Sequence, residues 1–461
     1  MEAKSNSLRD LNLLVIAEDF DIIGNVEKGF ISGAGSVEVV TPCSQKVVFN
    51  DKDFDLLIAV GGENLLTFIK KVRSTLPNPI LPFLWIASEE SRIIEKASDM
   101  YILIDEENPE LYRITKKILE IRSTISMFGE MDINYTSLEV EQVNVLRYIL
   151  SRKIKVAVPV VYERSKYGYV FPDLFTISKY DIFPLLDSME SEKMVKGEFV
   201  DSVRVCKNCG SAHIGLRKVC PNCGSSNIRV EDYIHHFRCG YLGPESDYRV
   251  AGSDKLICPK CKRELKHIGV DYDRPSQTYI CNECGNIFED PDYSYICFNC
   301  GEVFKEDEAK KFIVKKYFIT KFGEDLAFSG SAADVLLASA AESDPRFLAY
   351  DVFSVILDHE KKKAKRYGKR SCLLDLTLEV NGLSVIDLYD IISDTVSLLK
   401  LNLRETDMVS MLDRHIFVLL AETPCEQAEA FLKRIEKKLK MISEVKNSKV
   451  KISFELVEIK Q

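Results

Sequence analysis

The stretch CKNCGSAHIGLRKVCPNCGSSNI (206–228), continued by CPKCKRELKHIGVDYDRPSQTYICNECG (258–285), decides how the middle of this chain folds. Eleven of the fourteen cysteines lie between residues 206 and 300. Ten of them form CxxC pairs, which are Cys206/Cys209, Cys220/Cys223, Cys258/Cys261, Cys281/Cys284 and Cys297/Cys300. Cys239 follows His236 at the same spacing and supplies a sixth pair. Two intervening residues place both side chains on one tight turn facing one ion, so twelve ligands predict three closed four-ligand sites.

Two other uses of cysteine are alternatives to metal binding. A disulfide framework would require an exported chain, but residues 1–10 are polar and charged and show no signal peptide. A redox-active dithiol normally occurs once in a chain, whereas this pattern occurs five times. Paired cysteines in a chain without export signals more often bind a metal, so we expect zinc.

The sequence predicts six ligand turns, but it allows more than one way of pairing them into three sites. Intervening segments of hairpin length favour Cys220/Cys223 with His236/Cys239, and Cys258/Cys261 with Cys281/Cys284. Cys206/Cys209 would then join Cys297/Cys300. A rival scheme joins Cys206/Cys209 to Cys220/Cys223 and Cys281/Cys284 to Cys297/Cys300, and it allows His213 or His235 to replace His236.

The expected zinc ions, about three per chain, are structural. A catalytic zinc usually has three protein ligands and a water molecule, whereas sites with four protein ligands are closed. Binding of such an ion contributes roughly 10–16 kcal/mol of apparent free energy, which becomes folding free energy.

The same residues carry a family resemblance. The segments 206–228, HHFRCG (235–240) and 258–288 resemble the metal-binding thaumarchaeal output domain, type one, most specifically through HIGVDYDRP (267–275). The resemblance covers about residues 137 to 325. It implies a prokaryotic signalling output module, and it does not imply a particular chemistry.

Length and composition are those of a soluble protein with about three domains. The chain has 461 residues, 46% of them hydrophobic and 29% charged. A net charge of −9 argues against a generic nucleic-acid binder, which needs lysine and arginine to neutralise phosphates. No apolar run approaches the 18 residues that span a bilayer, so we expect a cytoplasmic protein in a reducing compartment.

Residues 1–125 alternate apolar runs with amphipathic stretches, which predicts a parallel α/β sandwich. The expected strands are Leu11–Ala17, Ser36–Thr41, Asp55–Val60, Pro82–Ala87 and Met100–Ile104. Helical spacing relates Ile22, Ile23, Val26 and Phe30, and also Leu65, Ile69 and Val72.

This first domain resembles a response-regulator receiver. Glu18 and Asp19 match the family's metal-binding acids, although their alternative role is to cap a loop. The phospho-acceptor position is Val60, which cannot accept a phosphoryl group, and no lysine follows the fifth strand (YILIDEEN). We therefore expect a pseudo-receiver, with Gly61–Gly62 as a turn.

Residues 126–200 form a helical connector leading into the output domain. Thr136 and Glu139 form a capping box before a helix with Val143, Leu146 and Ile149 on its apolar face. A second helix is expected over Ile182–Val195, with Leu185, Leu186, Met189 and Met194 in the core.

Residues 201–325 form the expected zinc-ribbon metal-binding module. Its loop residues Asp271, Asp273 and Arg274 predict either a polar recognition site or an Asp–Arg pair that stiffens the tip of a ribbon.

The Ser- and Ala-rich segment 326–345 is expected to be a linker that turns helical, followed by an α/β domain over 346–461. Its segments EKKKAKRYGKRSCLLDL (360–376), RETDMVSMLDRHIFVLL (404–420) and AEAFLKRIEKKL (428–439) resemble the GGDEF diguanylate cyclase family. The signature hairpin reads Asp413-Arg414-His415-Ile416-Phe417, so only its phenylalanine is retained. Asp375 aligns with a metal-binding aspartate, but one carboxylate does not hold two magnesium ions. The resemblance therefore implies a degenerate domain without cyclase activity.

Arg404-x-x-Asp407 lies five residues before this hairpin, at the spacing of the family's inhibitory site for cyclic di-GMP. An arginine can recognise guanine or phosphate, and an aspartate can accept from a guanine edge. The alternative is a surface ion pair of little energetic consequence.

Together these features predict a multidomain α/β chain with zinc ribbons. The expected function is that of a non-enzymatic signalling scaffold or effector that binds partner proteins, with cyclic di-GMP as a candidate ligand. The alternative is a zinc-ribbon regulator that binds nucleic acid, which the charge balance disfavours.

Overall fold

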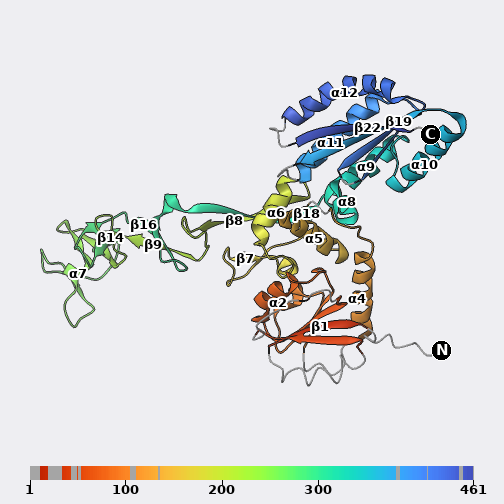
Figure 1. Ribbon diagram of the computed structural model, residues 1–461. Coiled ribbons are helices and arrows are strands. Elements are labelled where there is room, and N and C mark those ends of the chain that lie inside the picture. Colours follow the sequence, from red (N-terminus) through yellow and green to blue (C-terminus); the bar gives the residue numbers. More distant parts are fainter. Residues whose placement is uncertain are drawn as a thin grey trace. The chain divides into compact units, whose positions relative to one another are not determined.

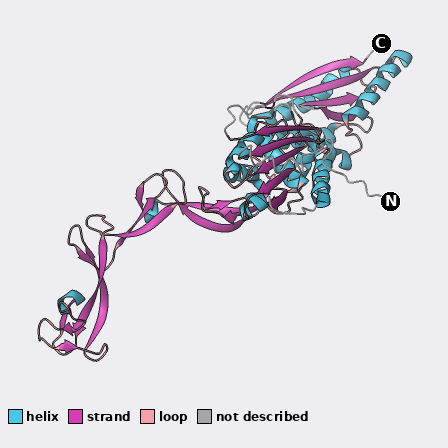
Figure 2. Cartoon of the chain, turned by 90° about the horizontal axis from the view of Figure 1, so that it is seen from below, coloured by secondary structure: helices cyan, strands magenta, loops and turns pink. Residues whose placement is uncertain are grey.

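The computed structural model describes residues 11–18, 34–42, 49, 53–103, 111–132, 135–380, 385–412, 414–445 and 450–459. The chain divides into two compact units. Unit 1 comprises Met1–Pro159, Phe171–Glu198 and Lys315–Gln461, and unit 2 comprises Val160–Val170 and Phe199–Val314. Unit 1 contains most of the helices, whereas unit 2 consists mainly of strands and loops (Figures 1 and 2).

A parallel sheet of five strands begins unit 1, in the order β2-β1-β3-β4-β5. The strands are β1 (Asn12–Ala17), β2 (Ser36–Val40), β3 (Leu56–Val60), β4 (Phe83–Ala87) and β5 (Met100–Leu103). All five predicted strands are confirmed, with small differences at their ends. They are predictable because a sheet covered on both faces needs continuous apolar runs.

Helices cover both faces of this sheet. The α2 (Leu65–Arg73) and α3 (Arg92–Ala97) helices pack against the face that contains Leu14 and Ile16. On the opposite face, α4 (Leu111–Ile125) packs against the side chains that alternate with these. The helix expected around residues 22–30, and Asp19, lie outside the described residues.

The loop at the carboxyl end of β3 is capped by Glu18. Its Oε1 accepts a hydrogen bond from the Gly62 backbone N–H at 3.2 Å. Glu18 therefore has the loop-capping role that was the alternative to metal binding. Many proteins with different functions share a five-stranded parallel sheet, so the receiver resemblance stays a hypothesis.

Two helices of the connector follow. The α5 helix (Ser137–Ser151) begins at Thr136, which forms the predicted capping box with Glu139. The α6 helix (Ile182–Ser191) ends earlier than predicted, because Val195 begins strand β8 (Val195–Val205). The four apolar residues predicted for its core are all buried.

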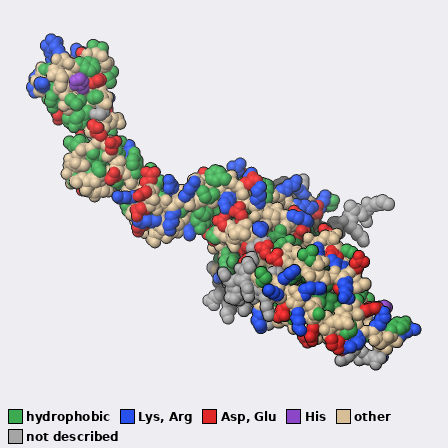
Figure 3. Space-filling view, turned by 90° about the horizontal axis from the view of Figure 1, so that it is seen from above, with side chains coloured by type: hydrophobic (Ala, Val, Ile, Leu, Met, Phe, Trp, Pro, Cys, Tyr) green, Lys and Arg blue, Asp and Glu red, His purple; other side chains and the backbone are tan. Residues whose placement is uncertain are grey.

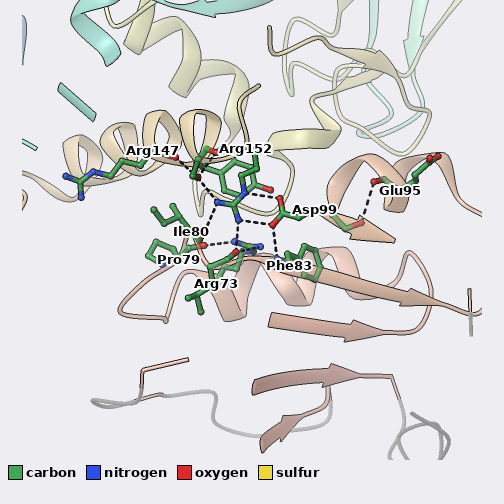
Figure 4. Close-up of polar contacts among 12 residues, drawn as sticks. Arg73, Pro79, Ile80, Phe83, Glu95, Asp99, Arg147 and Arg152 are labelled. Atoms are coloured by element: carbon green, nitrogen blue, oxygen red, sulfur yellow. Dashed lines mark hydrogen bonds and ion pairs between the residues drawn. The ribbon is translucent and has the colours of Figure 1, made fainter. Parts of the chain in front are cut away.

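A buried ion pair joins the end of α5 to the N-terminal sheet (Figure 4). The Arg152 guanidinium donates to both carboxylate oxygens of Asp99, each at 2.9 Å, and their side chains are 4% and 3% exposed. The same guanidinium donates to the carbonyls of Ile80 and Leu81, each at 2.7 Å, and lies 3.9 Å from the Tyr148 ring centroid. Its donors are thus shared between one carboxylate and the backbone.

A second arginine is buried beside this pair. Arg73 is fully buried and donates to the Pro79 carbonyl at 2.6 Å, and its Nε has no hydrogen-bond partner among the residues that the structure describes. Its guanidinium lies 5.0 Å from the Phe83 ring centroid. Burial lowers the pKa of Arg73 to about 10. Asp99 is therefore the carboxylate beside two buried guanidinium groups, which the sequence did not predict.

The C-terminal domain has an antiparallel sheet in the order β20-β21-β19-β22. These strands are β19 (Ser371–Val380), β20 (Met408–Leu412), β21 (His415–Leu420) and β22 (Val450–Ile459). The helices are α8 (Lys321–Ser329), α9 (Ala332–Ser343), α10 (Tyr350–Tyr367), α11 (Val385–Asn402) and α12 (Cys425–Val445). A disulfide joins Cys372 of β19 to Cys425 at the start of α12, and this bond was not predicted from the sequence.

The segment 326–345 turns helical, as predicted, and it also packs into the C-terminal domain, which was not predicted. The α8 and α9 helices occupy it, and Ala333, Leu336, Leu337 and Ala340 of α9 belong to the core of the C-terminal domain. Small side chains on this helix permit close packing, and alanine is the best helix former.

Unit 2 consists mainly of strand pairs, each formed between an earlier and a later part of its chain. Strand β8 pairs with β18 (Lys310–Ile319), β9 (Ile214–Val219) with β16 (Asp292–Cys297), and β10 (Ile228–His236) with β14 (Tyr272–Cys281). Shorter elements complete it: β6 (Val160–Val161), β7 (Tyr169–Val170), β11 (Tyr241–Pro244), α7 (Glu245–Tyr248), β12 (Leu256–Ile257), β13 (Glu264–Leu265), β15 (Ile287–Phe288) and β17 (Val303–Lys305). Among helices in the described ranges, none is both long and apolar enough to cross a membrane.

Candidate metal centres

The twelve predicted ligands converge in three groups of four within unit 2. The groups are Cys206, Cys209, Cys297 and Cys300; Cys220, Cys223, Cys281 and Cys284; and His236, Cys239, Cys258 and Cys261. Within each group all ligand atoms lie within 4.8 Å of one another. Each group is therefore positioned to hold a metal ion.

The pairing follows the nested strands of unit 2 and corrects the sequence-based scheme. The predicted pairing of Cys206/Cys209 with Cys297/Cys300 is confirmed. The other two predicted pairings, Cys220/Cys223 with His236/Cys239 and Cys258/Cys261 with Cys281/Cys284, are wrong, and so are both pairings stated in the rival scheme. The β10–β14 register places Ile228 opposite Cys281, which brings the turn at Cys220 beside the returning chain. The sequence argument failed because it assumed that neighbouring turns pair within short hairpins.

Each ligand pair is held by one tight backbone turn. The Gly210 N–H donates to the Cys206 carbonyl at 2.9 Å, and the other five turns have the same hydrogen bond. The residue that donates this N–H has a positive φ at each turn, a conformation that favours glycine, and glycine occupies it at five of the six turns. Lys262 takes this position in the remaining turn, at φ 62°.

The spacing of the ligand atoms fits a tetrahedral metal. In the first group Cys206 Sγ lies 3.7 Å from Cys300 Sγ, and Cys209 Sγ lies 3.6 Å from Cys297 Sγ. A tetrahedron with metal–sulfur bonds of about 2.3 Å has edges of about 3.8 Å. The distances are far too long for disulfides, so these cysteines fit metal ligation.

The third group contains the histidine. His236 is buried, and its Nδ1 lies 3.2 Å from Cys239 Sγ and 3.4 Å from Cys261 Sγ. Cys239 Sγ lies 3.5 Å from Cys258 Sγ. The structure thus brings His236 into the ligand group through Nδ1.

Asparagine side chains donate hydrogen bonds to several of the sulfurs. Asn299 Nδ2 lies 3.6 Å from Cys209 Sγ, and Asn222 Nδ2 lies 3.7 Å from Cys284 Sγ. The hydrogen bond from Asn299 is the main reason that the pKa of Cys209 is lowered to about 6. These donors stabilise thiolates, which are the form that binds a metal.

Sequence reasoning missed these asparagines, although a signal was present. Three of the turns read C-x-N-C, with Asn208, Asn222 and Asn299 before the second cysteine. Asn208 Nδ2 lies 3.9 Å from Cys300 Sγ. The repetition of one polar residue at one position indicates a shared contact.

Repulsion among the sulfurs of the first group favours a bound cation. The backbone N–H of Glu302 favours the Cys300 thiolate, yet desolvation and the neighbouring cysteines raise the pKa of Cys300 to about 11. Four negative sulfurs at this spacing repel one another. A bound cation would remove that repulsion.

The two alternative histidines lie outside the metal groups. His213 Nε2 lies 2.9 Å from the Ser165 carbonyl oxygen. His235 Nδ1 lies 3.4 Å from Asp273 Oδ1.

The loop acids and Arg274 have structural contacts. Asp271 accepts from the backbone N–H groups of Lys266 and His267, both at 2.9 Å. Arg274 pairs with Glu245 at 2.8 Å and with Asp232 at 3.4 Å, so its acidic partners come from outside the loop. The Asp–Arg pair within this loop, which was one of the two alternatives, is not formed.

The residues of the cyclase resemblance are engaged within their own sheet. Asp375 on β19 accepts from His415 Nδ1 on β21, at 3.0 and 3.1 Å to its two oxygens. Arg414 is part-buried and Ile416 is buried, while Asp413 lies outside the described residues. The carboxylate that aligns with a metal ligand therefore already has a partner.

Arg404 and Asp407 do not form a shared surface site. Arg404 is exposed, whereas Asp407 is 2% exposed and accepts a hydrogen bond from the Arg404 backbone N–H at 2.8 Å. Burial raises the pKa of Asp407. The pair predicted to receive cyclic di-GMP is therefore divided between surface and interior.

One part of the chain matches a known protein family. Residues 134–319 match the family model described as Thaumarchaeal output domain 1. This match includes all three ligand groups. No curated protein matches the chain.

Similarities to solved structures are partial. They include the diguanylate cyclase SiaD in complex with its activator SiaC from Pseudomonas aeruginosa, at 17% identity and a TM-score of 0.20. That match covers 24% of this chain and 46% of the SiaD chain, less than half of its length. The FimX GGDEF domain from Pseudomonas aeruginosa matches at 19% identity over 24% of this chain and 75% of its own, with a TM-score of 0.20. The orphan response regulator HP1043 of H. pylori matches at 18% identity over 24% of this chain and 94% of its own, with a TM-score of 0.16. TM-scores this low do not establish a shared fold.

Proposed function

We propose that this chain is a signalling protein without catalytic activity, whose output module is held together by three structural zinc ions. The observation that carries the proposal is the complete set of four donors in each group, two groups with four sulfurs and one with three sulfurs and a nitrogen. Such sets favour zinc and leave no ligand position for water or substrate. The match to an output domain supports the signalling part of the proposal.

The zinc ions would act on folding. Unit 2 has small apolar clusters, and two of them contain the ligand cysteines themselves. A module with so little apolar core depends on metal binding for its stability. Each zinc ion would thus join two ligand turns that lie apart in the sequence of unit 2.

The lack of cyclase activity is supported by the contacts of Asp375. Its two oxygens are held by His415, and the hairpin glycines that admit a nucleotide are replaced by larger residues. We expect no turnover of GTP with magnesium, and formation of a cyclic dinucleotide would contradict this part.

Partner proteins are the proposed targets of the output module. On the face of unit 2 seen in Figure 3, acidic and basic side chains are interspersed with apolar ones. This mixture supports a protein partner better than a nucleic acid, which favours a basic surface. Cyclic di-GMP has less support, because only Arg404 of the proposed pair is accessible.

Metal analysis with a fold readout tests the proposal. Protein purified without chelator should contain about three zinc ions per chain, on the ligand count above. A strong chelator should abolish the strand structure of unit 2 and leave the fluorescence of Trp85, the one tryptophan, unchanged, because Trp85 lies in the N-terminal sheet. Folded, metal-free unit 2 would overturn it.

A further inference from the structure

Glu192 is a buried acid at the end of α6. It is the C-cap residue of this helix and is 9% exposed, and strand β8 begins soon after it, at Val195. No lysine or arginine is among the main charged neighbours of its carboxyl group in the described part of the chain. A negative charge at this position would be costly, because burial removes its hydration and no cation replaces the water.

Gln142 of α5 is the side chain that hydrogen-bonds to this carboxyl group. Gln142 is 0% exposed, and its Nε2 donates to Glu192 Oε1 at 3.2 Å and to Ser188 Oγ at 3.1 Å. Both hydrogens of the amide are therefore used. The Gln142 side chain thus joins α5 to the last turn of α6.

Two buried oxygens of this pair lack a hydrogen-bond donor. They are Gln142 Oε1 and Glu192 Oε2, and neither has a partner among the residues that the structure describes. Buried acceptors without a donor cost free energy. A protonated carboxyl group has an O–H donor, so an acid and an amide can form two parallel hydrogen bonds. One proton on Glu192 Oε2 would therefore satisfy both oxygens.

The surroundings of Glu192 favour this neutral form. Burial raises the pKa of Glu192. The carboxylates of Glu139 on α5 and Asp387 on α11 raise this pKa further, whereas hydrogen bonds from Gln142 and from the backbone N–H of Val385 lower it. The charged groups that face Glu192 from the neighbouring helices are thus acids, and they disfavour its ionisation.

We propose that Glu192 is protonated in the folded protein and donates a hydrogen bond to Gln142 Oε1, so that the contact between α5 and the end of α6 responds to pH. Release of this proton to solvent would leave a buried carboxylate against the Gln142 oxygen. The last turn of α6 would then separate from Gln142 and expose Glu192 to water. Because β8 begins at Val195, the change occurs where the connector passes into the strand that leads to the metal module.

A raised pKa makes the closed contact most stable at low pH. The full stabilisation is present below the ordinary glutamate pKa of about 4.3, and it is lost as pH rises through the raised pKa of Glu192. Between these two values the closed form keeps the proton and the open form releases it. The equilibrium constant for opening should therefore rise by up to about tenfold per pH unit.

Infrared spectroscopy and hydrogen exchange of the full-length, zinc-loaded chain test this assignment. At a pH of about 6, where exposed glutamates are ionised, the difference spectrum between the wild type and Glu192→Gln should contain the carbonyl stretch of one protonated carboxylic acid. After correction for intrinsic exchange rates, opening of the amides in the last turn of α6 should increase with pH by up to about tenfold per unit in the wild type. The same opening should change less than about twofold in Glu192→Gln, whose side-chain amide can replace the acid as donor.

Glu190→Gln is the matched control, because Glu190 is an acid of the same helix that pairs with Lys315 at 2.7 Å. It should keep the pH response of the wild type. A difference spectrum without the band of a protonated acid, or opening in the wild type that does not depend on pH, would overturn the proposal. An equal pH response in Glu192→Gln, or loss of the response in Glu190→Gln, would overturn it as well.

Discussion

Removing the charge of Asp99 should destabilise the N-terminal sheet, because this carboxylate pairs with a buried arginine. Asp99→Asn keeps the shape of the side chain but leaves the guanidinium groups of Arg73 and Arg152 buried without a carboxylate. Removing one partner of a buried ion pair typically costs about 3–5 kcal/mol. The carbonyls of Ile80 and Leu81 still accept from Arg152, so we expect about 3 kcal/mol.

The single tryptophan makes this change measurable. Trp85 of β4 is buried and donates to the Gly61 carbonyl at 2.8 Å, so its fluorescence reports unfolding of the N-terminal sheet. At a urea dependence of about 1–3 kcal/mol per molar, a loss of about 3 kcal/mol lowers the midpoint by at least about 1 M.

Glu120→Gln serves as the control for charge removal. Glu120 pairs with Lys153 at 3.8 Å, with side chains 45% and 75% exposed, and such pairs contribute about 0–1 kcal/mol. A loss below about 1 kcal/mol in Asp99→Asn, or a loss equal to that of Glu120→Gln, would refute the reasoning from burial.

Three further predictions concern the C-terminal domain. Cys425→Ser should destabilise it by up to about 4 kcal/mol, because the bond to Cys372 closes a loop with a sequence separation of 53, and thermal unfolding under oxidising conditions measures this loss. The Arg346 guanidinium, 2.6 Å from Asp344, lowers the pKa of that carboxyl. The pair therefore stabilises the domain above the carboxyl's unfolded pKa and loses this effect as pH falls, so the unfolding free energy of Asp344→Asn should depend less on acid pH. Isothermal titration of cyclic di-GMP should give no heat with the wild type, and heat that Arg404→Ala abolishes would contradict the buried position of its partner.

Local features of the fold could be predicted from the sequence. The five parallel strands are continuous apolar runs, and the α5 start is fixed by the Thr136 capping box. The twelve ligands were found because a two-residue spacing constrains both side chains to one turn. In each of these cases the determining residues are neighbours in the chain.

Features that depend on distant residues could not be predicted. The nested pairing of the metal turns follows from the β9–β16 and β10–β14 registers, which no single turn encodes. Arg73 and Asp99 appear in the sequence as ordinary charged residues, and only tertiary packing buries their side chains. The segment of α9 was expected to turn helical, but its place in the core of the C-terminal domain was not predicted, because small residues are typical both of linkers and of closely packed helices.

Cadmium-113 NMR of the fully substituted protein tests the central claim most directly. The account predicts three protein-bound resonances, two in the range of four-sulfur sites and one in the range of sites with three sulfurs and a nitrogen. His236→Cys should move the third resonance into the four-sulfur range. Fewer than three resonances, or three of a single class in the wild type, would contradict the assignment of ligands.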